Sequence, residues 1–240
     1  MVAKVSDEWN VLDHGPIERI SERLWRVEGA IPRMTLRRVL TVAKREGGGL
    51  VIHSAIALRA PELSELEAWG KPEVLAVPGA YHRLDAPAYK KRFPELRVYA
   101  PSASVGKVRE VVPVDGSYED CPADEAVELR NVPGTGGREG AMFVRSEEGL
   151  SVVLNDVVMN MDTKRDFLGY LFTTLLGSAP GPRVSRLSKL ALVTDRRALR
   201  AELERLAALP DLANLIVSHE KVARGRAEAR AALERAATFL

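Results

Sequence analysis

Two histidines and two aspartates lie at or just beyond the ends of predicted strands, where α/β proteins commonly place functional side chains. His82 and Asp85 share one loop, Asp156 directly follows the apolar run at 151–155, and His219 follows the run at 215–217. Neutral imidazole and carboxylate groups together suit zinc, iron or manganese. If these loops converge in the folded chain, the four side chains could bind a metal ion.

Each of the four residues also has a structural interpretation, and residue type alone leaves both open. His82 and His219 could be loop histidines that bond to the backbone. Asp85 could cap the helix predicted at 86–93, because aspartate is a preferred N-cap residue. Asp156 could be a turn residue that ends a strand. The four interpretations are linked, since one true ligand would imply the others.

Other residues with reactive side chains carry less indication of chemistry. His53 ends a predicted strand and is interpreted as structural, and His14 lies in a segment before the first predicted strand. The only cysteine, Cys121, has no second thiol with which to pair. The glycine-rich loop at 134–140 lacks the Lys-Ser/Thr pair of a phosphate-binding loop and is predicted to be a turn.

The elements that must position these residues alternate between strands and helices along the chain. Short apolar runs predict strands at 24–27, 36–43, 50–53, 74–77, 98–100, 111–114, 126–132, 141–145, 150–154 and 215–217. Helical periodicity predicts helices at 61–69, 86–93, 186–193, 195–209 and 221–240, with a broken apolar stretch at 167–176. This interleaving predicts an α/β fold with helices covering the faces of sheets.

The composition excludes several classes of protein. The 240 residues are 46% hydrophobic and 28% charged, as in ordinary globular proteins. No run of about 18 apolar residues is present, so neither a transmembrane helix nor a membrane partner is expected. The 35 basic and 33 acidic residues nearly balance, which gives no electrostatic indication of nucleic-acid binding. The first residues lack an apolar signal region, and the single cysteine favours a cytoplasmic location.

The order of these features resembles the metallo-β-lactamase-fold superfamily, and more narrowly a divergent branch of predicted metal-dependent hydrolases. The stretch GLVIHS at 49–54 is similar to the family's first strand, which normally ends in an aspartate. The loop VPGAYHRLD at 77–85 stands where the family carries its His-x-His-x-Asp-His motif. VPGTGGREG at 132–140, VVLND at 152–156 and LIVSH at 215–219 resemble three further ligand-bearing segments.

The resemblance implies a four-layer αββα sandwich, in which two mixed sheets are flanked by helices. It implies one domain over 1–240, with residues 1–22 as a leader segment packed on it. Several family ligand positions hold other residues here: Ala80, Leu84, and Gly134 or Thr135. A standard two-metal centre is therefore not encoded. The expected site is mononuclear, with the ligands His82, Asp85, Asp156 and His219, and with His53, Tyr81, Arg83 and Thr135 around them.

By the same resemblance, a metal-activated water would hydrolyse a small ester, lactone, amide or phosphoester. Two alternatives stay open. The chain could be a non-catalytic relative without metal that keeps the fold for binding a ligand or a protein, or it could hold iron in a redox role. The segment at 160–182 could be a lid over the site or the contact surface of a homodimer.

Overall fold

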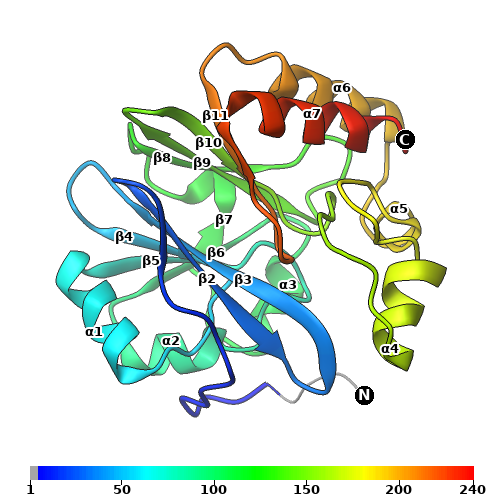
Figure 1. Ribbon diagram of the computed structural model, residues 1–240. Helices are drawn as coiled ribbons and strands as arrows, with labels where there is room; N and C mark the ends of the chain where they lie inside the picture. The colour runs from blue at the N-terminus through cyan, green and yellow to red at the C-terminus, as the bar shows by residue number, and fades with distance from the viewer. Residues whose placement is uncertain (1–4) are drawn as a thin grey trace.

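Two β-sheets form the centre of the protein, as the computed structural model of residues 5–240 shows (Figure 1). The first sheet has seven strands in sequential order: β1 (Glu18–Ser21), β2 (Leu24–Ile31), β3 (Met34–Lys44), β4 (Leu50–His53), β5 (Pro72–Ala76), β6 (Arg97–Ala100) and β7 (Gly116–Ser117). The second sheet has the order β12 (Ala223–Arg224), β11 (Leu212–Ile216), β10 (Gly149–Val153), β9 (Gly140–Ser146) and β8 (Val127–Asn131). Both sheets are mixed, because β4, β5 and β6 run parallel, as do β10 and β11.

Helices cover the outer face of each sheet. The first sheet packs against α1 (Ala60–Trp69), α2 (Ala86–Arg92) and α3 (Val105–Arg109), and the second packs against α6 (Arg196–Ala207) and α7 (Gly225–Ala237). A short 3-10 turn, η1 (Tyr118–Asp120), follows β7. This is the four-layer αββα arrangement that the family resemblance implied.

Strand β4 shows how the alternation of side chains builds the layers. Leu50 and Ile52 pack towards α1, where they share a cluster with Leu63 and Leu66. Val51 faces the other way and joins the cluster between the two sheets. Since side chains alternate along a strand, His53 also faces the space between the sheets.

A separate helical segment lies at one edge of the sandwich. It consists of α4 (Phe167–Tyr170), a π-helical turn, η2 (Leu171–Leu175), and, after a loop, α5 (Arg186–Ala191). The Asp166 carboxylate begins α4 by accepting a hydrogen bond from the Gly169 backbone N–H at 3.0 Å. Among residues 5–240 no helix has the length and apolar character needed to cross a bilayer.

One predicted strand does not form, and a strand that the sequence did not predict lies at 18–21. No strand forms at 111–114, because Val111 and Val112 close the end of α3 through hydrogen bonds to the Val108 carbonyl, and Pro113 has no N–H to offer a neighbouring strand. The expected leader at 1–22 contains β1, which pairs with β2 as the edge of the sheet. The first four residues of that leader lie outside the described part of the chain.

Candidate metal centre

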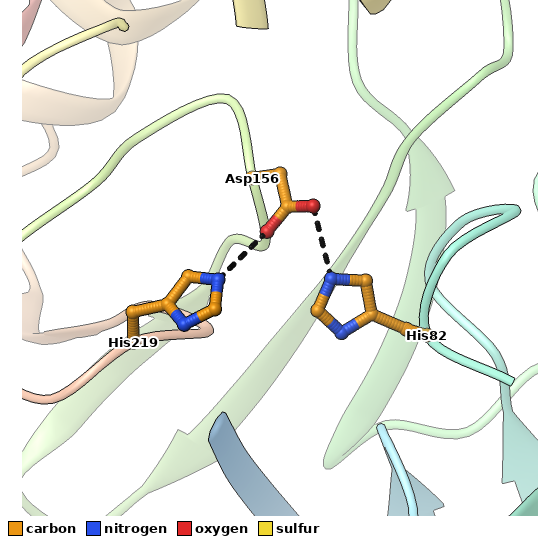
Figure 2. Close-up of side chains that lie close together, drawn as sticks. All are labelled: His82, Asp156 and His219. Carbon is orange, nitrogen blue, oxygen red and sulfur yellow. Dashed lines mark hydrogen bonds and ion pairs between the residues drawn. The ribbon is translucent and has the colours of Figure 1, made fainter. Parts of the chain in front are cut away.

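Three of the predicted ligands lie on loops that leave three different strands. His82 lies between β5 and α2, Asp156 follows β10, and His219 follows β11. Because β10 and β11 are parallel neighbours, their carboxyl ends meet at one edge of the second sheet. The loop after β5 reaches the same place from the first sheet (Figure 2).

The Asp156 carboxylate stands between the two imidazole rings. Its Oδ2 lies 3.0 Å from His82 Nε2, and its Oδ1 lies 3.5 Å from His219 Nε2 (Figure 2). One ligand atom from each of the three residues lies within 4.8 Å of the other two. Two imidazole nitrogens and one carboxylate oxygen form a donor set that suits zinc, iron or manganese.

Hydrogen bonds on the far side of each ring fix how the histidines point. His219 Nδ1 lies 2.6 Å from the Arg37 carbonyl, which can only accept a hydrogen bond, so Nδ1 carries a proton and the neutral ring has its lone pair on Nε2. His82 Nδ1 lies 3.2 Å from the Ser54 hydroxyl. Metal-binding histidines usually engage their second nitrogen in this way, which leaves Nε2 to bind the metal.

Glu139 anchors the loop that carries Asp156. Its carboxylate accepts hydrogen bonds from three successive backbone N–H groups, those of Asn155, Asp156 and Val157, at 3.1, 2.9 and 3.1 Å. The Ser218 hydroxyl donates to Asp156 Oδ1 at 2.8 Å. Hydrogen bonds therefore fix both the backbone and the side-chain carboxylate of Asp156.

Burial and charge oppose each other in this group. Burial disfavours the ionised form of Asp156, but the charges and hydrogen bonds of His82 and His219 outweigh it and hold the pKa of that carboxyl well below its usual value. Burial also disfavours protonated His219, but Asp156 raises its pKa. Burial, together with the neighbouring Asp156 charge, raises the pKa of Glu139 well above its usual value. The site therefore keeps its negative charge on Asp156.

Asp85, the fourth expected ligand, is not brought together with the other three. Its Oδ2 lies 2.6 Å from Arg38 Nη2 and accepts a hydrogen bond from the Ala57 backbone N–H at 3.3 Å. Asp85 also begins α2, although its side chain makes no capping hydrogen bond there. The buried Arg38 side chain thus pairs with the Asp85 carboxylate, which the sequence analysis had predicted to be a metal ligand.

Of the four residues expected around the site, three face solvent or make other contacts, and His53 lies near His82. Tyr81 is 74% exposed, and Arg83 pairs with Glu110 at 2.9 Å. Thr135 is buried and donates to the Val132 carbonyl at 2.7 Å. His53 is buried between the sheets, where burial and the nearby His82 lower its pKa to about 3.

Sequence reasoning did not anticipate Glu139, Ser54 or Ser218 as partners of the site. Ser54 and Ser218 each adjoin a histidine in the sequence, and Glu139 is the only carboxylate within the glycine-rich loop. These are slight signals, because the contacts depend on the packing of both sheets.

Solved structures of other proteins share the fold of this chain. No family model matches the chain, and no curated protein sequence matches it significantly. The solved metallo-β-lactamase from Erythrobacter litoralis, which holds β-mercaptoethanol in its active site, is 14% identical with a TM-score of 0.58 over 93% of this chain and 96% of its own. The enzyme from Hirschia baltica is 15% identical, with a TM-score of 0.57 over 92% and 99% of the two chains.

A third similar structure is the metallo-β-lactamase FIM-1 from Pseudomonas aeruginosa in its mono-zinc form. It is 12% identical to this chain, with a TM-score of 0.58 over 97% of this chain and 98% of its own. These likenesses show that the chain has the metallo-β-lactamase fold, as its motifs predicted. At such identities they show the fold alone.

Proposed function

We propose that the protein is a metal-dependent hydrolase whose single metal ion is held by His82, Asp156 and His219. The observation that carries this proposal is the convergence of one ligand atom from each residue within 4.8 Å, on loops from both sheets. Among residues 5–240, no other group of three histidine, cysteine, aspartate or glutamate side chains comes as close. This favours a mononuclear site.

The residues of the chain are arranged to receive a cation. In its neutral form His219 has its lone pair on Nε2, because its Nδ1–H donates to the Arg37 carbonyl. Asp156 supplies the negative charge, and Glu139 fixes the backbone on which it is carried. When bound, the metal ion would act as a Lewis acid that makes water nucleophilic near neutral pH. Three protein ligands are typical of catalytic sites, which keep one position open.

The proposed substrate is a small ester, lactone, amide or phosphoester, since water activated at a single metal ion attacks such bonds. The structure also supports leaving Asp85 out of the ligand set. Arg38 is permanently charged, and its ion pair with Asp85 would have to break before that carboxylate could bind a metal. A cytoplasmic location stays a prediction from the single cysteine.

The test is elemental analysis of protein purified without chelator or nickel affinity resin. We expect about one equivalent of zinc, iron or manganese in the wild type and a loss of metal in His82→Ala and His219→Ala. The matched control is the double variant Arg38→Gln/Asp85→Asn, which removes the other carboxylate together with its compensating charge. It should keep the metal.

Two results would contradict the proposal. Wild-type protein that takes up none of the three ions, even after incubation with each, would leave a fold retained for binding without metal chemistry. Loss of metal in the double variant, with normal folding, would return Asp85 to the ligand set.

A further inference from the structure

The helical segment formed by α4 and η2 presents a row of apolar side chains to solvent. Phe167 is 82% exposed, Tyr170 50% and Leu175 56%, and Leu168 and Leu171 are exposed beside them. We call these five side chains the apolar ridge. No charged residue lies between 167 and 176. In Figure 1, α4 stands out from the body of the sandwich at its edge. Large exposed apolar patches mark interaction sites in soluble domains.

The inward side of the same segment is firmly packed. Phe172 contacts a cluster that contains Leu36 of β3, Met159 and Met161. Thr173 is buried, and its hydroxyl donates to the Gly169 carbonyl at 2.7 Å. The Thr35 hydroxyl donates to Asp166 at the start of α4. The apolar ridge is therefore the outer face of an anchored element.

Basic residues outnumber acidic ones in the segment that carries the ridge. Residues 163–196 contain six lysines and arginines against two aspartates. Lys164 pairs with Glu220, but within residues 5–240 no acidic side chain pairs with Arg165, Arg183, Arg186, Lys189 or Arg196.

Three contacts place some of these cations at the end of η2 and beside one another. The Arg186 backbone N–H donates to the Leu176 carbonyl at 2.9 Å, which places α5 against the end of η2. Lys189 reaches the Phe239 carbonyl at 3.0 Å, and the Arg183 guanidinium lies over the Phe239 ring. Burial and the charges of Arg196, Arg183 and Arg186 lower the pKa of Lys189, as expected where cations crowd together.

We propose that the apolar ridge and its flanking cations form a docking surface for a lipid membrane that contains anionic headgroups. Aromatic and leucine side chains enter the boundary between headgroups and acyl chains, and lysine or arginine beside them contacts the headgroups. A second copy of the chain fits less well, because a twofold contact brings the same cations face to face. The near-neutral charge of the whole chain concealed this local excess, so the proposal departs from the expectation of no membrane partner.

The docking surface lies next to the candidate metal centre without containing any of its ligands. The Phe172 ring, on the inward side of η2, meets the His219 ring at a centroid distance of 6.1 Å. Docking would thus bring the centre close to the lipid surface. Membrane binding does not require the metal, and the two proposals can fail separately.

The experiment is co-sedimentation of the full chain with vesicles of phosphatidylcholine alone and of phosphatidylcholine mixed with phosphatidylglycerol. We expect binding to the mixed vesicles that weakens as salt is raised, and little binding to phosphatidylcholine alone. Phe167→Ser/Leu171→Ser and Arg165→Glu/Arg186→Glu should each weaken binding by roughly tenfold or more. Lys71→Glu, an exposed charge reversal beside α1, should bind as the wild type does.

Circular dichroism of every variant establishes that the fold is retained, since all substituted side chains are exposed. The proposal is overturned if the wild type ignores anionic vesicles or binds both vesicle types equally. It is also overturned if the ridge variants bind anionic vesicles as well as the wild type does. A third contrary result would be that the wild type sediments as a dimer and the ridge variants sediment as monomers. That last result would assign the ridge to a second copy of the chain.

Discussion

Two carboxylates near the same edge of the molecule have opposite surroundings. Asp156 faces two imidazole rings, at 3.0 and 3.5 Å, and a serine hydroxyl. Asp85 faces the Arg38 guanidinium at 2.6 Å and a backbone N–H. Both were predicted ligands: Asp156 directly follows a strand, and Asp85 shares the loop that carries His82. What separates them is the partner that the fold brings to each.

The difference follows from the chemistry of the partners. A guanidinium stays protonated in proteins and has no lone pair, so it neutralises a carboxylate and excludes a cation. An imidazole can be neutral, and its free nitrogen can bind the same metal ion as the carboxylate. The Asp85 pair is complete as it stands, whereas the Asp156 group can accept a further positive charge.

The largest effect is expected from breaking the Asp85 pair. Arg38→Gln leaves a buried carboxylate without its cation and should lower the free energy of unfolding by about 3–5 kcal/mol. Urea denaturation of the metal-free protein measures this. The double variant Arg38→Gln/Asp85→Asn should recover most of the loss, and equal destabilisation of both variants would show that Arg38 acts through packing alone.

His53 extends the comparison to a buried side chain that has neither an ion-pair partner nor a hydrogen-bond partner for its Nε2 among the described residues. Burial lowers the pKa of His53 to about 3. Below about pH 6.5 the unfolded chain gains a proton there that the folded chain refuses, so stability is lost as the pH falls. Between pH 7 and 5 the loss should be about 2 kcal/mol.

The check on this pH dependence is His53→Leu, compared with the wild type by urea denaturation at pH 7 and pH 5. The variant should lose about 2 kcal/mol less than the wild type over that interval. An equal loss in both proteins would mean that His53 is protonated in the folded state.

The smallest effect concerns the imidazole side of the comparison. Ser54→Ala removes the hydroxyl that lies 3.2 Å from His82 Nδ1 and should weaken metal affinity about tenfold, because the ring loses the contact that orients it. Ser178→Ala is the control: Ser178 is also buried, but its hydroxyl bonds to no described residue. The measurement is a metal titration of both variants. Equal metal affinities would show that the Ser54 hydroxyl does not help to orient His82.

Much of the fold could be read from local patterns. The strand predicted at 50–53 is β4, and the helix predicted at 195–209 contains α6, which Asp195 caps by accepting hydrogen bonds from the N–H groups of Arg197 and Ala198. Alternation and capping are properties of neighbouring residues, so sequence reveals them. The failure at 111–114 is of a different kind. There an apolar run packs beneath the helices of the first sheet without pairing as a strand.

The site was less predictable, because its contacts join distant parts of the chain. The sequence offered His82, Asp156 and His219, but nothing near Asp85 indicated that Arg38, on β3, would pair with it. Glu139 escaped notice for the same reason. Its role depends on the loop after β10 folding over the start of β9. Residue types suggested the candidates, and long-range packing selected among them.

The connection between β10 and β11 has a consequence for how the chain folds. Their pairing joins Ser151 to Asn214 across 63 residues, and His82 meets Asp156 across 74. Contacts of such large sequence separation form late, after the local helices and hairpins. On the ribosome, the three ligands cannot meet until the residues beyond β11 have emerged. Uptake of a metal ion would therefore report that the strands of both sheets have been synthesised and have paired.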